Sequence, residues 1–107
     1  VQMATETVAQ LKDEENCQLV ICLSHLGYHY NSGKISDLEL AAKTKDIDLI
    51  IGGHTHTFLP KPTVVKNSVD KNVLINQVGW AGINLGRIDF FLEKDGTTTG
   101  DGTSIII

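Results

Sequence analysis

Cysteine, proline, aromatic residues and basic charge are all sparse in this 107-residue chain. It has 2 cysteines, 2 prolines and 6% aromatic residues, and its 9 basic residues stand against 13 acidic ones for a net charge of −4. The scattered Lys and Arg argue against a nucleic-acid partner, because affinity for a phosphate backbone rests on clustered basic residues. No apolar run approaches the roughly 20 residues that cross a bilayer, so we expect no membrane span.

The two cysteines predict neither a disulfide framework nor a metal site. Cys17 and Cys22 lack Cys-x-x-Cys spacing, and a bridge between them would bend the strand predicted there. The first residues, Val1 to Ala4, show no basic segment followed by an apolar stretch, so no signal peptide is predicted. Because the chain begins without methionine, we expect it to be a piece of a longer polypeptide or a processed product.

The first part of the chain, residues 1–59, has the pattern of a βαβ unit. A helix is expected from Met3 to Glu15, and Leu19 to Leu23 is an apolar run typical of a strand covered on both faces. The capping-box spacing of Ser36 to Glu39 begins a second helix that runs to Lys43. Ile47 to Ile51 is the next buried strand, at a distance that suits a right-handed crossover.

The remaining residues, 60–107, read as antiparallel β-structure. Pro60 and Pro62 interrupt the chain, and strands are then expected at residues 63–66, 73–78, 85–93 and 104–107, with turns at 95–96 and 100–102. The two parts together predict a single α/β domain, with a βαβ unit followed by antiparallel strands.

Three histidines follow the two buried strands. His25 comes after the first strand, and His54 and His56 come after the second, in Gly52-Gly53-His54-Thr55-His56. The carboxyl ends of parallel strands meet at one edge of a sheet, where α/β proteins bind ligands, so we expect the imidazoles to converge there. His54 and His56 would point the same way if their segment were extended.

Imidazole is a common ligand of transition metals, and three ligands with one open position form a catalytic zinc site. His29, in the loop after the first strand, is expected to be exposed or to lie at the mouth of a substrate site. Asp46 and Asp48 stand at the opposite end of the second strand and are expected to be solvated.

These motifs resemble a known family. Leu23-Ser24-His25-Leu26-Gly27, followed by residues 48–57, is similar to the last two motifs of the calcineurin-like metallophosphoesterases, within the bacterial 5′-nucleotidase branch. The likeness continues through residues 76–79 and 85–89. The resemblance implies that the chain is half of a four-layer α/β/β/α metallophosphoesterase sandwich.

The resemblance also implies chemistry. His25 and His54 would bind one divalent metal ion and His56 a second, and Zn, Mn and Fe all suit such ligands. The ion pair would activate a hydroxide for attack on phosphorus and neutralise phosphoryl charge. The parent would hydrolyse nucleoside 5′-monophosphates, in the periplasm or outside the cell.

The family's Asp-x-His, Gly-Asp-x-x-Asp and Gly-Asn-His-Asp/Glu motifs are absent from this sequence. They bring the bridging aspartate, the remaining ligands and the catalytic histidine, so we expect this chain alone to be inactive and to bind one ion weakly or none. Two alternatives remain open: a mononuclear zinc hydrolase built on His25, His54 and His56, and a non-catalytic module that associates through exposed β edges. In every case the exposed faces and the apolar residues 105–107 predict a homo-oligomer.

Overall fold

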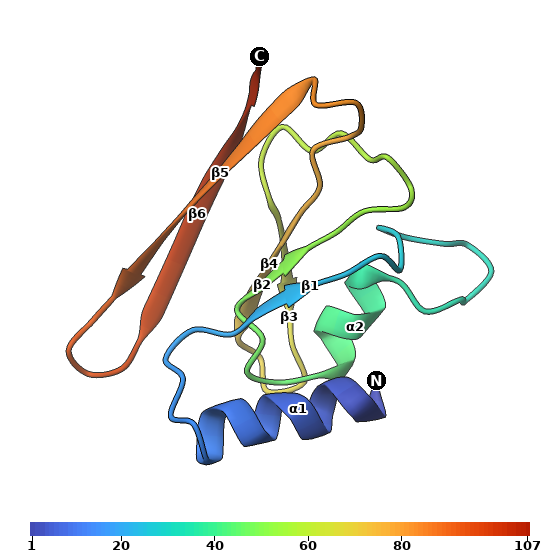
Figure 1. Ribbon diagram of the computed structural model, residues 1–107. Helices are drawn as coiled ribbons and strands as arrows, with labels where there is room; N and C mark the ends of the chain where they lie inside the picture. Colours follow the sequence, from blue (N-terminus) through green and yellow to red (C-terminus); the bar gives the residue numbers. More distant parts are fainter.

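The computed structural model describes all of residues 1–107. Its core element is a sheet of four strands in the order β1-β2-β4-β3. These strands are β1 (Ile21–Leu23), β2 (Leu49–Ile51), β3 (Thr63–Lys66) and β4 (Asn72–Asn76). β1 and β2 are parallel, with Leu23 opposite Ile51, and a helix precedes β2, so the expected βαβ unit is confirmed (Figure 1).

β4 differs from the sequence-based expectation in its direction. It pairs with β3 in antiparallel fashion, as expected, but it also pairs in parallel with β2 along Leu49 to Ile51. Its residues Val73, Leu74 and Ile75 are buried, and a strand buried on both faces is typical of the centre of a mixed sheet. β4 therefore extends the parallel sheet of the βαβ unit across the boundary at residue 60.

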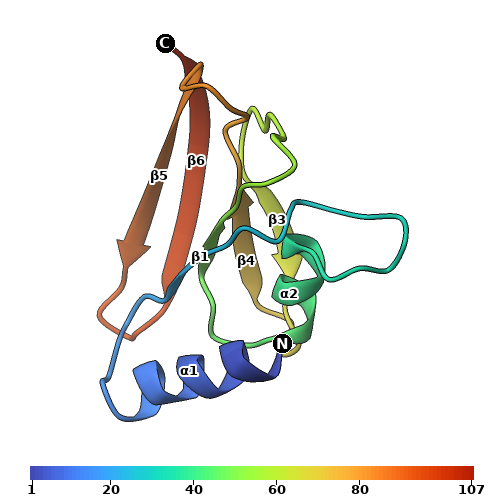
Figure 2. The same cartoon turned by 45° about the vertical axis from the view of Figure 1, so that its right-hand side comes forward.

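Two helices pack against this sheet. α1 (Gln2–Asp13) lies across one end of the sheet and buries Val8, while α2 (Asp37–Lys43) contacts β3 and β4 (Figures 1 and 2). α2 begins as the capping box predicts, since the Ser36 side chain accepts a hydrogen bond from the Glu39 amide.

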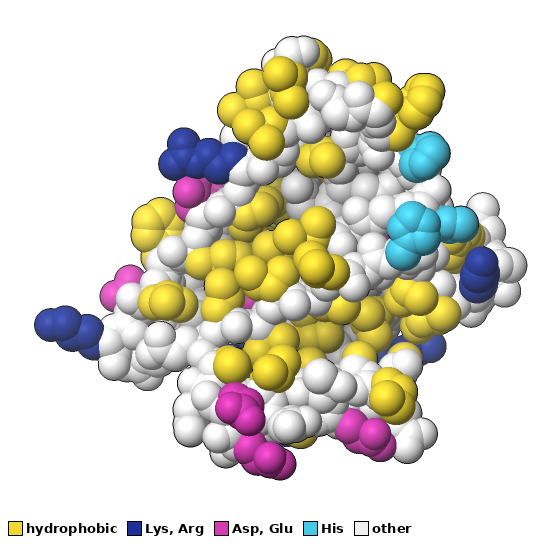
Figure 3. Space-filling view, viewed as in Figure 1, with side chains coloured by type: hydrophobic (Ala, Val, Ile, Leu, Met, Phe, Trp, Pro, Cys, Tyr) yellow, Lys and Arg dark blue, Asp and Glu magenta, His cyan; other side chains and the backbone are white.

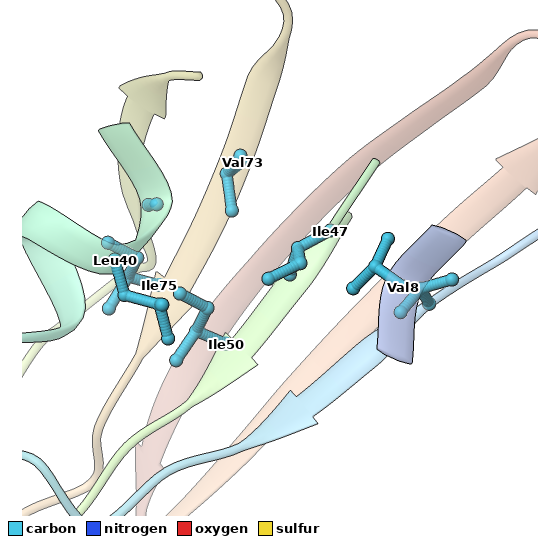
Figure 4. Close-up of a cluster of buried hydrophobic side chains, with 8 residues drawn as sticks. Val8, Leu40, Ile47, Ile50, Val73 and Ile75 are labelled. Carbon is cyan, nitrogen blue, oxygen red and sulfur yellow. The ribbon is translucent and has the colours of Figure 1, made fainter. Parts of the chain in front are cut away.

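The core lies where α1, α2 and the sheet meet. It is a cluster of eight buried apolar side chains, six of which are labelled in Figure 4: Val8, Leu40, Ile47, Ile50, Val73 and Ile75. At about 25 cal/mol per Å² of apolar surface removed from water, such a cluster supplies the main favourable term in folding.

The last two strands form a separate hairpin. β5 (Asn84–Leu92) and β6 (Thr98–Ile106) pair in antiparallel fashion and lie on the opposite side of the four-stranded sheet from α2 (Figure 2). The predicted turn at residues 100–102 is wrong, because Gly100 and Gly102 lie inside β6. They stand opposite Phe90 and Ile88, whose side chains occupy the space that a Cβ at either glycine would need.

Apolar side chains also cover the middle of one face of the molecule (Figure 3). β1 is an edge strand of the sheet, and its Ile21 and Leu23 side chains are 48% and 80% exposed. None of the helices has the length and apolar character needed to cross a membrane.

Candidate metal centre

The parallel pairing of β1 and β2 brings two of the predicted histidines together. His25 follows the end of β1 and His54 follows the end of β2, and their ring centroids are 5.2 Å apart in an edge-to-face arrangement with an interplanar angle of 71°. Both side chains are exposed, and histidines gather on the right of the face drawn in Figure 3.

The segment that carries His54 and His56 is not extended, which corrects the expectation from sequence. Both residues have positive φ angles, 70° for His54 and 51° for His56. The Thr55 amide donates to the Gly53 carbonyl at 2.9 Å, so His54 is the central residue of a tight γ-turn. Positive φ is uncommon in residues other than glycine and clusters at functional sites.

This turn sends the two imidazoles in different directions. The His56 ring stacks on the exposed Trp80 indole, with centroids 5.9 Å apart and an interplanar angle of 10°. No group of three His, Cys, Asp or Glu side chains is placed so that it could hold one metal ion. The mononuclear three-histidine alternative therefore lacks the convergence that it requires.

The spacing of the His25 and His54 rings can be compared with that of two imidazole ligands on one metal ion. Zinc binds imidazole nitrogen at about 2.0–2.1 Å, and two rings on one tetrahedral ion have centroids roughly 5 Å apart. The observed centroid separation of 5.2 Å matches that spacing. Gly53 lets the His25 ring lie close to the backbone of the second loop, because a Cβ at Gly53 would be only 3.0 Å from His25 Nδ1. His29 is exposed in the loop after β1.

Two buried polar side chains lie beneath these loops, and sequence reasoning gave them no role. Asp37 is fully buried at the start of α2, and burial raises the pKa of its carboxyl, opposed by a hydrogen bond from Ser24. Gln77, 2% exposed, follows β4 and hydrogen-bonds to the segment around His54. The capping box and the family-like motif at residues 76–79 marked these positions without indicating what they contact.

Asp48 also departs from expectation, because it is not simply solvated. Its carboxylate accepts hydrogen bonds from the Val20 amide at 2.8 Å and the Thr98 hydroxyl at 3.3 Å, and it lies 4.0 Å from the Lys12 ammonium. It sits at the amino end of β2, away from the histidines, so it joins α1, β6 and the residue that precedes β1.

A mixed α/β sheet that carries an imidazole pair at the carboxyl ends of its parallel strands defines a candidate metal-dependent hydrolase site. No protein-family model matches the chain. Among solved structures, a 5′-nucleotidase precursor from Thermus thermophilus matches 99% of the chain with a TM-score of 0.85 and 29% sequence identity, over 22% of its own length.

Curated relatives agree with this match. The chain is 37% identical over 106 residues to a trifunctional nucleotide phosphoesterase from Bacillus subtilis. The aligned region is 99% of this chain and 7% of that protein. It is also 32% identical over 73 residues to a 5′-nucleotidase from Vibrio parahaemolyticus, and this aligned region is 61% of the chain and 13% of that protein. The chain thus spans only a small part of the length of these relatives. It is homologous to the 5′-nucleotidases, and the resemblance found in the sequence is confirmed.

Proposed function

We propose that this chain forms part of a divalent-metal-dependent phosphoric monoester hydrolase, in which His25 and His54 bind one metal ion and His56 binds a second. The observation that carries the proposal is the His25 and His54 pair, 5.2 Å apart at the ends of adjacent parallel strands. The separate direction of His56, against Trp80, supports its assignment to a different ion.

The side chains of this chain bind and orient in that reaction. Divalent ions at such a site supply an activated water and positive charge opposite the phosphoryl oxygens. His25 and His54 would hold their ion from two loops that are tied together, because the Tyr28 amide donates to the Thr55 hydroxyl at 3.0 Å. Trp80 covers one face of the His56 ring and limits its rotation.

For the parent protein we propose a nucleoside 5′-monophosphate as substrate, released as nucleoside and phosphate. The names of the relatives support this class of substrate. We also propose that the parent acts in the periplasm or outside the cell, in keeping with the branch that the sequence resembles.

The chain alone should show negligible phosphatase activity. It contributes three imidazoles, and its sequence lacks the motifs that bring the bridging carboxylate and the remaining ligands. Transition-state stabilisation by fixed charge depends on that complete set of groups.

Thermal unfolding in the presence of Zn²⁺ tests the metal assignment. A ligand that binds only the folded state raises the melting temperature, so Zn²⁺ should stabilise the wild-type chain. His29→Ala, at an exposed histidine outside the pair, should respond as the wild type does, and the double variant His25→Ala, His54→Ala should not respond. An equal response of the double variant would contradict the assignment.

Hydrolysis of adenosine 5′-monophosphate tests the proposed substrate class and the proposed inactivity of the isolated chain. The isolated chain should release no more phosphate than the double variant, whereas a longer protein recovered from the surrounding coding region should hydrolyse it in a manner abolished by chelation. Turnover by the 107-residue chain above the double-variant level would show that it is a complete enzyme.

A further inference from the structure

A buried polar network lies directly under the two histidine loops. Asp37 is fully buried, and its Oδ1 accepts a hydrogen bond from the Ser24 hydroxyl at 2.5 Å. Ser24 Oγ in turn accepts from the Leu26 amide at 3.2 Å. These bonds enclose His25 on both sides, because Ser24 precedes it and Leu26 follows it. The Asp37 amide adds a third tie by donating to the Gly27 carbonyl at 2.8 Å.

Gln77 makes a similar set of hydrogen bonds to the loop that carries His54 and His56. Its Nε2 donates to the Gly53 carbonyl at 3.0 Å, just before His54. Its Oε1 accepts from the Thr57 amide at 2.5 Å, just after His56, and from the Thr55 hydroxyl at 3.3 Å. One buried side chain therefore spans the whole turn in which His54 and His56 hold positive φ angles.

The two halves of the network meet at Gly52. A Cβ at Gly52 would overlap the Asp37 carboxylate and would lie 3.2 Å from Gln77 Nε2. Asp37 Oδ2 is buried there and has no hydrogen-bond partner. A buried acceptor without a partner destabilises the folded state, so stability alone does not account for a carboxylate at this position.

We propose that Asp37, acting through Ser24, and Gln77 are positioning residues that hold the loops of His25 and His54 at the spacing that a shared metal ion requires. Neither side chain is a ligand in this proposal. They act as the outer hydrogen-bond partners of a metal site do, since such partners fix the orientation of the ligands and their loss lowers metal affinity.

The proposal predicts a difference between apolar and conservative substitutions. Asp37→Leu and Gln77→Leu remove the hydrogen bonds to the loops, and each should lower Zn²⁺ affinity about 10- to 100-fold in a calorimetric titration. Asp37→Asn keeps an acceptor for the Ser24 hydroxyl, and Gln77→Glu keeps the acceptor for the Thr57 amide. Both conservative variants should recover most of the affinity.

Asp48→Leu is the matched control. Asp48 also accepts a backbone amide and a hydroxyl, but it stands at the other end of β2. Its substitution should lower the melting temperature and leave Zn²⁺ affinity unchanged. If Asp48→Leu weakens Zn²⁺ binding as much as Asp37→Leu does, the residues act through general stability and the positioning role is refuted.

The Zn²⁺ titration rests on the proposed function, because it requires that the chain binds metal. A measurement without metal tests the positioning role separately. In NMR spectra of the metal-free chain, Asp37→Leu and Gln77→Leu should weaken the cross-relaxation between the His25 and His54 rings and speed hydrogen exchange at the Leu26 and Thr57 amides. Asp48→Leu should do neither. If a variant unfolds, Ser24→Ala replaces Asp37→Leu and Gln77→Met, which keeps the length of the side chain, replaces Gln77→Leu. Loss of protection is then expected at the Leu26 amide and at the Thr57 amide, respectively.

Two results are then distinguishable. A wild-type chain that takes up no Zn²⁺ contradicts the metal assignment, and the positioning role is decided by the ring and amide signals alone. Unchanged ring and amide signals in the variants at positions 37 and 77 would overturn the positioning role whatever the Zn²⁺ result.

Discussion

Substitution of Gly52 by alanine is a sharp test of the packing beneath the site. Gly52 directly follows β2, and its missing side chain leaves the space in which Asp37 and Gln77 approach each other. An added Cβ would overlap the Asp37 carboxylate and approach Gln77 Nε2 to 3.2 Å. The carboxylate would have to move, and its full burial at the start of α2 leaves it little room to do so.

The expected cost follows from two opposing effects. Gly52 does not have a positive φ angle, so alanine fits the backbone and gains about 0.4–1 kcal/mol from the reduced entropy of the unfolded chain. Overpacking a filled interior costs about 1–3 kcal/mol. The net loss should be about 1–2 kcal/mol in the free energy of unfolding, which corresponds to a fall of roughly 5–15 °C in the melting temperature of a domain of this size.

Circular dichroism with thermal and guanidinium unfolding measures this loss, and the adjacent Gly53→Ala variant is the control. A Cβ at Gly53 would lie 3.0 Å from His25 Nδ1, but the His25 side chain is exposed and can turn away. Gly53→Ala should therefore cost little stability while it disturbs the histidine pair. Equal stability of Gly52→Ala and the wild type would refute the filled space under the loops.

Three further outcomes are expected. Ile75→Ala removes a fully buried side chain of the core and should lower the free energy of unfolding by about 2–5 kcal/mol in urea, and a loss below about 1 kcal/mol would contradict the packing. Burial raises the folded-state pKa of Asp37 above 3.8, against the opposing Ser24 hydrogen bond, so the folded chain binds the extra proton and stability should fall as pH rises through that pKa. Asp37→Asn should reduce this pH dependence of stability, measured as urea midpoints from acidic to neutral pH. An unchanged pH dependence would show that another group causes it. In sedimentation at micromolar concentration the chain should self-associate, and Leu23→Lys on the exposed edge strand should shift it toward monomer, whereas a wild-type monomer would contradict the predicted oligomer.

The sequence alone determined where the main elements lie and which edge of the sheet carries the site. The apolar run before His25 and the one before His54 are local patterns, and a capping box is local as well, so both the strands and the start of α2 at Asp37 follow from neighbouring residues. The parallel pairing of β1 and β2 then requires that residues after both strands meet at one edge.

Only the tertiary structure decided how the site is shaped. His54 and His56 have positive φ angles in a segment that is hydrogen-bonded at both ends to Gln77, which lies on a distant part of the chain. In the sequence, Gly100 and Gly102 predict a turn. In the structure they lie opposite Phe90 and Ile88 across the hairpin, and the side chains of these two residues occupy the space that a Cβ would need.

Asp37 and Asp48 make the same point, since both are acidic residues beside a secondary-structure boundary. One is fully buried with an unpartnered oxygen beneath the histidine loops, and the other joins three elements at the far end of the sheet. A local pattern reports the propensity of a residue and its neighbours, whereas burial and hydrogen-bond partners are set by segments brought together from distant parts of the chain.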